Sequence, residues 1–206
     1  MNIYEYFKDR ETYIPEVKVK KYMFQLLQAL DYMHRNGVFH RDIKPENILL
    51  KGDDIKLADF GSCKGFGNRD KLHTEYVSTR WYRSPECLLT KGAYDYKMDI
   101  WGVGCVFYEI LSLQPLFPGK NEIDQVHLIH KILGTPSMRI FQRFKKWPNK
   151  EFNFKFKEFK GQGIRSLLPH VSKKCINLIL KLLTYDPMTR PTCQQALNNV
   201  YFCETP

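Results

Sequence analysis

Two short acidic stretches, separated by a turn sequence, constrain how this chain can fold. The first runs from His40 to Asn47 (HRDIKPEN), and the second is DFG at residues 59–61. Between them, the aliphatic runs ILL (48–50) and IKL (55–57) flank KGDD at 51–54. Two such runs on either side of a Gly-Asp turn predict an antiparallel β-hairpin. The hairpin would bring the two acidic stretches together.

The side chains of these stretches suit phosphoryl transfer, in which a hydroxyl is aligned with a phosphate and the charge is neutralised by magnesium. Asp42 is placed to accept or orient the hydroxyl proton, and Lys44 to hold the moving phosphate as a point charge. Asn47 and Asp59 offer the oxygen ligands that Mg²⁺ prefers. The alternative is a turn whose charges satisfy one another, without any chemistry.

HRDIKPEN followed by DFG, with SPE at residues 84–86, resembles the catalytic and metal-binding loops of eukaryotic protein kinases. The sequences TEY (74–76), DFGSC and SLQPLFPG are most similar to the MOK and MAK-related kinases, which are mitogen-activated-like serine/threonine kinases of the CMGC group. The resemblance implies transfer of the ATP γ-phosphate to protein substrates, with ATP and Mg²⁺ as cofactors. It also implies a mainly helical, α+β kinase fold whose hairpin carries the catalytic and metal loops.

The resemblance covers residues 1–206 as the C-terminal lobe of a kinase domain. This sequence has no Gly-rich phosphate-covering loop, strand lysine or partner helix ahead of the catalytic loop. We therefore expect a truncated kinase domain without its N-terminal lobe, with impaired activity. Leu49 would still form the floor of the adenine site, whereas His40 and Phe60 would lack the side chains that normally cover them. The alternative is an inactive interaction module that competes for the partners of a kinase.

Residues 62–86 resemble the activation segment of a kinase, and TEY resembles a dual phosphorylation site for an upstream activating kinase. Each phosphate would add nearly two negative charges and would need guanidinium partners. The expected sites are Thr74 and Tyr76, with Arg41 receiving the first phosphate and Arg80 and Arg83 the second. An exposed tripeptide without a switch function is the alternative.

Several further residues match supporting positions of the kinase family. Thr79 resembles the threonine that bridges the catalytic aspartate and lysine, which together with Lys44 favours serine or threonine as the acceptor. Residues 80–83 (RWYR) resemble the pocket for the residue after the acceptor, where the family often prefers proline. Asp99 resembles the aspartate that caps the catalytic loop, and Arg190 the arginine that pairs with Glu86.

Hydrophobic periodicity predicts the main helices. The first extends from Pro15 to Asn36, and His34 near its end is expected to be a surface or capping histidine. The region from Tyr96 to Leu113 is apolar around most of its circumference, which predicts a buried helix whose Gly102 and Gly104 allow close packing. Further helices are expected over Asn121 to Leu133, from Ser172 through Leu183, and in a last segment that ends near Val200.

Composition indicates one sizeable core, since 43% of the 206 residues are hydrophobic and 14% are aromatic. The net charge of +10 would suit nucleic acid, but Lys and Arg are scattered along the chain. The six cysteines show no C-x-x-C pair, and there is neither a leading signal peptide nor a membrane-spanning run. We expect reduced thiols in a cytoplasmic protein, with the nucleus or cilium as alternatives implied by the family. Neither nucleic acid nor membrane is an expected partner, and the oligomeric state is left open.

Residues 120–170 match the insert that CMGC kinases carry at this position. Within them, KKWP at 145–148 precedes the alternating Phe152, Phe154 and Phe156. Aromatic side chains between basic ones could bind single-stranded nucleic acid. The expectation from the family is instead that these aromatic side chains pack on the lobe.

Overall fold

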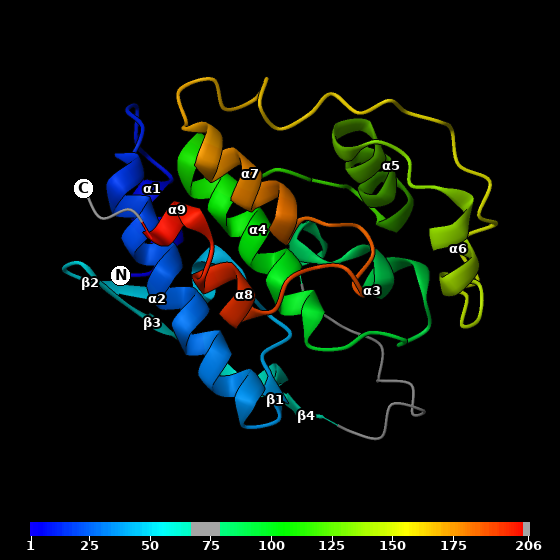
Figure 1. The fold of residues 1–206 in the computed structure, drawn as a ribbon, viewed down its shortest axis with the longest axis horizontal. Helices are drawn as coiled ribbons and strands as arrows, with labels where there is room; N and C mark the ends of the chain where they lie inside the picture. The colour runs from blue at the N-terminus through cyan, green and yellow to red at the C-terminus, as the bar shows by residue number, and fades with distance from the viewer. Residues whose placement is uncertain (67–78, 204–206) are drawn as a thin grey trace.

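Helix α4 (Lys97–Ser112) lies at the centre of the molecule, and the other elements surround it (Figure 1). The computed structural model describes residues 1–66 and 79–203. Every residue from Met98 to Leu111 is buried, as expected for a helix that is apolar on all sides. Helices α2 (Glu16–Arg35) and α7 (Lys173–Leu182) both pack against it.

The N-terminal part of the chain forms two helices. Helix α1 (Ile3–Phe7) begins at Asn2, whose side chain and that of Glu5 form a capping box. Helix α2 begins directly after Pro15 and ends before Gly37, which has a φ of 74°. The predicted helix is therefore confirmed, and its buried face lies against the core.

The predicted hairpin is also confirmed. Strands β2 (Ile48–Lys51) and β3 (Asp54–Leu57) pair antiparallel, with Ile48 opposite Leu57. Gly52 adopts a φ of 62° in the turn, a conformation that favours glycine. A second small sheet joins β1 (Val38–Phe39) to β4 (Lys64–Gly65). The segment that enters the hairpin and the one that leaves it are short 3₁₀ turns, η1 (Pro45–Asn47) and η2 (Phe60–Ser62).

The C-terminal part is helical and contains one departure from expectation. The helix expected to end near Val200 is α8 (Cys193–Leu197), which already ends at Leu197, and an additional short helix, α9 (Val200–Cys203), follows after Asn198 and Asn199. The side-chain oxygen of Asn199 accepts a hydrogen bond from the backbone of Tyr201, which starts the second helix. The elements of this part are η3 (Arg80–Tyr82), α3 (Pro85–Leu89), α5 (Glu122–Leu133), α6 (Met138–Phe144), α8 (Cys193–Leu197) and α9 (Val200–Cys203).

Two glycines of α4 lie where no side chain would fit. A Cβ atom at Gly102 would lie 2.9 Å from the Cβ of Ile43, and one at Gly104 would lie 2.8 Å from the side chain of Leu183. The close packing expected for these glycines is confirmed. Gly102 thus brings α4 into direct contact with the loop that carries Asp42.

The mainly helical architecture with one hairpin agrees with the expected fold class. All six cysteines are free thiols, as expected from their spacing. Phe152 and Phe154 are buried, and they pack with Phe141 and Phe156 rather than facing solvent. Within residues 1–66 and 79–203, no helix is long and apolar enough to cross a membrane.

Candidate active site

Asp99 of α4 forms hydrogen bonds with the backbone of the loop that carries Asp42. One carboxylate oxygen of Asp99 accepts a hydrogen bond from the backbone N–H of His40 and the other from that of Arg41, both at 2.8 Å. Arg41 has a φ of 70°, which costs a residue other than glycine about 1–3 kcal/mol. Asp99 therefore stabilises a strained turn immediately before Asp42, and these are the hydrogen bonds expected of it.

Asp42, Lys44 and Asn47 form one bonded cluster. The Lys44 ammonium lies 2.8 Å from Oδ2 of Asp42, and the Asn47 amide nitrogen donates to the same oxygen and to the Asp42 carbonyl, both at 2.9 Å. Asp42 is only 5% exposed, so these bonds are shielded from bulk water. The cluster holds the carboxylate in one orientation beside a cation.

The hairpin brings Asp59 to this cluster. The backbone N–H of Ala58 donates to the Asn47 carbonyl at 2.9 Å, and His40 Nε2 lies 3.0 Å from the Ala58 carbonyl. Asp59 itself is exposed, has a φ of 61°, and accepts one long hydrogen bond of 3.3 Å from the Gly61 N–H. Its carboxylate is therefore directed out of the loop.

The donor set fits a magnesium ion held together with phosphate. Because the Asn47 amide nitrogen is engaged by Asp42, the amide oxygen is the atom left to bind a cation. Asp59 adds a solvent-facing carboxylate, and Mg²⁺ is commonly held by one or two protein oxygens plus phosphates and water. The described residues contain no cluster of three or more His, Cys, Asp or Glu side chains that could hold a metal by themselves.

Leu49, expected to form the floor of the adenine site, and Phe60, expected to lack its covering side chains, both lie on the surface. Leu49 is 46% exposed and lines a hollow together with Asn2 and Glu5. Phe60 is 58% exposed and contacts His40 edge-on, with ring centroids 5.7 Å apart. His40 is fully buried beneath this open apolar surface.

His34 corrects one expectation from the sequence. It is 8% exposed rather than on the surface, and its Nε2 shares a 2.8 Å hydrogen bond with Oδ2 of Asp99. Its Nδ1 lies 3.5 Å from the sulfur of Cys193 in α8. The helical spacing already contained the signal, because His34 follows the buried Leu27 and Leu30 by seven and four positions. His34 therefore supports Asp99 rather than capping α2.

The expected phosphate-receiving arginines already have partners in the protein. Arg41 donates from Nε to the Ser62 carbonyl at 2.6 Å, and Arg80 donates to the Lys120 carbonyl at 3.3 Å. Arg83 lies 2.8 Å from Glu122 in an ion pair. The two expected phosphorylation sites, Thr74 and Tyr76, lie outside the described residues.

Thr79 does not form the bridge expected from the sequence. Its side chain is exposed just ahead of η3, and it makes no bond with Asp42 or Lys44 within the described part of the chain. Lys44 and Asp42 instead contact each other directly.

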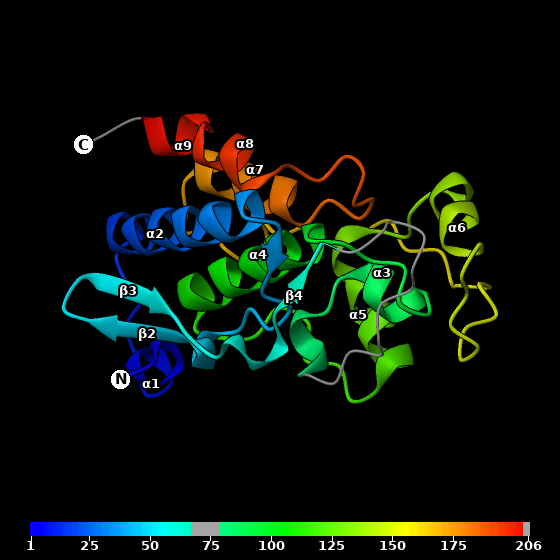
Figure 2. The same cartoon turned by 90° about the horizontal axis from the view of Figure 1, so that it is seen from below.

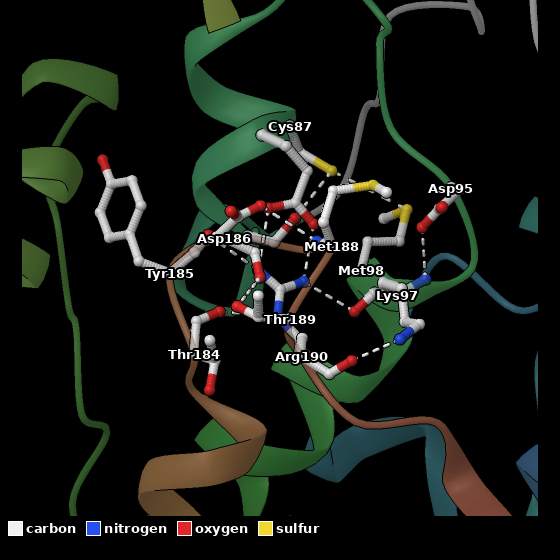
Figure 3. A network of polar contacts seen from close by, with 12 residues as sticks. Cys87, Asp95, Lys97, Met98, Thr184, Tyr185, Asp186, Met188, Thr189 and Arg190 are labelled. Carbon is white, nitrogen blue, oxygen red and sulfur yellow. Dashed lines mark hydrogen bonds and ion pairs between the residues drawn. The ribbon is translucent and has the colours of Figure 1, made fainter. Parts of the chain in front are cut away.

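The expected pairing of Arg190 with Glu86 is present and fully buried. Two guanidinium nitrogens donate to the two carboxylate oxygens at 2.7 and 3.0 Å, and each residue is 1% exposed. Figure 3 shows how Arg190 also reaches the backbone of Thr184 and Lys97, while Lys97 binds the Arg190 carbonyl. The bidentate pair links α3 to the start of α4 and to the loop before α8.

A buried pair that the sequence did not reveal joins η3 to α4. The Tyr82 hydroxyl donates to Oε2 of Glu109 at 2.8 Å, and Glu109 is 3% exposed. Burial, assisted by the negative charge of Glu46, raises the pKa of the Glu109 carboxyl to about 7, although the hydrogen bond from Tyr82 opposes this. A single acidic residue within an otherwise apolar run was the available signal.

Comparison with known proteins places this site in a family. The model of the protein kinase domain matches residues 1–202. The human MAPK/MAK/MRK overlapping kinase is 53% identical over 204 residues, which are 99% of this chain and 48% of that protein. The human serine/threonine-protein kinase MAK is 40% identical over 207 residues, covering 98% of this chain and 32% of that protein. A probable serine/threonine-protein kinase of Dictyostelium discoideum is 44% identical over 204 residues, with coverage of 98% and 40%.

The chain thus spans about half the length of the human overlapping kinase and about a third of MAK. The domain match extends over nearly every residue, including the loops that carry Asp42 and Asp59. The chain therefore belongs to the protein kinase family, within the MAK-related branch of the CMGC group.

Proposed function

We propose that this chain provides the C-terminal-lobe side of a serine/threonine kinase active site, which transfers the γ-phosphate of ATP to protein substrates. The observation that carries the proposal is the bonded cluster of Asp42, Lys44 and Asn47, held next to Asp59 on a loop stabilised by Asp99. A carboxylate, a cation and two oxygen ligands meet there, which is the set that phosphoryl transfer requires on one side of the phosphate.

Each residue of the cluster has a separate role in this proposal. Asp42 orients the substrate hydroxyl and accepts its proton, because its carboxylate is held in place by Lys44 and Asn47. Lys44 places its positive charge where the transferred phosphoryl group passes. Asn47 and Asp59 would hold the metal, and Leu49 would support the adenine. Mg²⁺-ATP, when bound, supplies the phosphoryl group and neutralises its charge.

A proline-directed acceptor preference is the finer part of the proposal. The Trp81 indole N–H donates to the Gly119 carbonyl at 3.2 Å, and the Gln125 amide donates to the Trp81 carbonyl at 3.3 Å. Residues 80–83 are therefore tied to the start of α5, which supports a rigid wall for the residue after the acceptor. Transfer to a Ser-Pro peptide but not to its Ser-Ala counterpart is expected, and equal rates would contradict the preference.

Regulation by phosphorylation of Thr74 and Tyr76 is also proposed. Arg41, Arg80 and Arg83 are expected to exchange their present contacts for phosphate oxygens after an upstream kinase modifies residues 62–86. The double variant Thr74→Ala, Tyr76→Phe is expected to lower activity severalfold after activation. Full activity of that variant would remove the switch.

We assign residues 1–206 to the C-terminal lobe and residues 120–170 to the CMGC insert. The exposed Leu49 and Phe60 support a covering partner such as the N-terminal lobe of a kinase. The 206 residues contain no Gly-rich loop or strand lysine, so the chain alone is expected to transfer phosphate poorly. An inactive module that competes for kinase partners is the second candidate, favoured by the same exposed surface.

The test compares phosphate transfer by the chain alone with transfer by the same chain joined to the N-terminal lobe of the human overlapping kinase. Activity in the joined protein, lost in its Asp42→Asn variant, would support the proposed enzyme. A folded joined protein without activity would favour the interaction module. Saturable binding of Mg²⁺-ATP by the chain alone at micromolar concentration would contradict the expected impairment.

A further inference from the structure

The segment from residue 138 to 165, named here the basic ribbon, carries most of the net positive charge of the molecule. The segment contains nine lysines and arginines but only two glutamates. Its net charge is therefore +7, compared with +10 for the whole chain. It consists of α6 and the irregular stretch that follows it. Figures 1 and 2 place α6 at the end of the molecule opposite the hairpin of β2 and β3.

Most phenylalanines of the basic ribbon face the protein interior, whereas Trp147 is exposed. Phe141 is 2% exposed, and Phe152 and Phe154 are each 7% exposed. Phe141 packs against His130 and Tyr185, with ring centroids 5.9 and 6.3 Å away. The buried phenylalanines fix the backbone of the segment against the rest of the protein, while its charged side chains remain exposed. These phenylalanines are not available to stack on nucleic acid bases.

Most cations of the ribbon have no counter-charge among residues 1–66 and 79–203. Arg143 pairs with Asp186, and the ammonium groups of Lys145 and Lys157 lie over aromatic rings. The other six side chains are exposed and have no hydrogen bond, ion pair or ring contact within the described residues. They are Arg139, Lys146, Lys150, Lys155, Lys160 and Arg165.

We propose that the basic ribbon binds an acidic segment of a partner protein. Six exposed cations without counter-charges in one segment attract carboxylates and accelerate their encounter with the surface. Trp147, which is 47% exposed between Lys146 and Pro148, offers an apolar contact to side chains interspersed among those carboxylates. The proposal goes beyond phosphoryl transfer, and binding can be measured without ATP, so its failure would leave the proposed enzyme intact.

The test uses two triple variants that change the net charge equally. The ribbon variant carries Lys146→Glu, Lys150→Glu and Lys155→Glu. The control variant carries Lys51→Glu, Lys56→Glu and Lys173→Glu, which are equally exposed lysines outside the ribbon. Fluorescence anisotropy of a labelled polyglutamate peptide is measured at low salt. The ribbon variant is expected to weaken binding about tenfold or more, and the control about twofold or less.

Three outcomes would overturn the proposal. The first is an equal loss of affinity in both triple variants, which would indicate a general charge effect. The second is the absence of saturable peptide binding by the unmodified protein at low salt. The third is tighter binding of a single-stranded oligonucleotide or of phosphatidylserine vesicles than of polyglutamate, abolished by the ribbon variant. Thermal unfolding checks that both variants fold. If the ribbon triple variant does not fold, the double variant Lys150→Glu, Lys155→Glu replaces it and is compared with Lys51→Glu, Lys56→Glu. The expected losses are about fivefold for the ribbon pair and less than about twofold for the control pair.

Discussion

The polar network around Asp99 and the aromatic cluster around His130 both bury histidines, but they do so in different surroundings. His34 and His40 form hydrogen bonds with the carboxylate of Asp99 or with backbone groups, and these bonds support the strained loop before Asp42. His130 is enclosed by the rings of Phe141, Phe156 and Tyr185.

The candidate active site and the basic ribbon place their charged groups differently. Near the candidate active site, charged groups are buried in pairs. Each pair fixes the orientation of its side chains, although removing the charges from water costs free energy. In the basic ribbon the interior is apolar and the charges are outside, which leaves them available to a partner. Truncating a buried charged side chain should therefore lower the free energy of unfolding strongly, whereas changes to the exposed cations of the ribbon should affect binding alone.

The largest expected effect is the loss of one partner of the Glu86–Arg190 pair. Arg190→Ala would leave a carboxylate buried without its counter-charge, and we expect the free energy of unfolding to fall by about 3–5 kcal/mol. The matched control is Arg35→Ala, because Arg35 forms a pair of similar length with Asp31 but is exposed on α2. That change should cost less than about 1 kcal/mol. Similar losses in urea unfolding would contradict the division between buried and exposed charge.

The next prediction compares a residue that stabilises the catalytic loop, Asp99, with one that acts on the substrate, Asp42. Asp99→Ala removes the acceptor for His34, His40 and Arg41, and should cost about 2–4 kcal/mol of unfolding free energy. Asp42→Asn keeps the shape of the loop, so it should leave the melting temperature within a few degrees while abolishing transfer in the joined enzyme. Equal melting temperatures of the two variants would show that Asp99 does not hold the loop.

Acid should weaken the aromatic cluster through His130. Burial lowers the pKa of His130 from 6.5 to about 4, so the unfolded chain binds a proton before the folded one does. The contribution is complete above pH 6.5 and is lost as the pH falls toward 4, by about 1–3 kcal/mol. The free energy of unfolding, measured with urea, should therefore depend less steeply on pH between 4 and 6.5 in His130→Phe than in the unmodified protein. An unchanged slope in that variant would exclude His130 as the source.

Glu109 should act with the opposite sign and makes the smallest expected contribution. Its pKa is raised from 4.5 to about 7, so its stabilisation is complete below pH 4.5 and is lost as the pH rises through 7. Tyr82 continues to donate to the ionised carboxylate, so we expect a loss of about 1–2 kcal/mol. In Glu109→Gln the stability between pH 4.5 and 7 should rise more steeply with pH than in the unmodified protein. Identical profiles would show that Glu109 is ionised in the folded state throughout.

Local signals in the sequence were sufficient for the hairpin and the longer helices, but not for the short elements β1, β4, α3 and α6 or for every partner. The hairpin follows from two aliphatic runs around Gly52, and α2 from its periodicity between Pro15 and Gly37. Asp99 and Arg190 were placed by family resemblance, and the structure supplies the hydrogen bonds expected of them.

Two partnerships were not predicted because the deciding contact lies far along the chain. His34 was expected at the surface because its partner Asp99 is 65 positions away and its other contact, Cys193, is 159 positions away. The pairing of Tyr82 with Glu109 was missed for the same reason. Thr79 was expected to bridge Asp42 and Lys44, but its side chain faces solvent at the start of η3.

The absence of a side chain at Gly102 has a mechanical consequence. Because α4 contacts Ile43 with no intervening space, the helix and the catalytic loop cannot slide past each other, and a tightly packed interior hardly compresses. Any push on α4 is passed through Ile43 to its neighbour Asp42. We therefore expect a displacement of the Gly102 turn of α4 to shift Ile43 and, with it, the neighbouring carboxylate of Asp42.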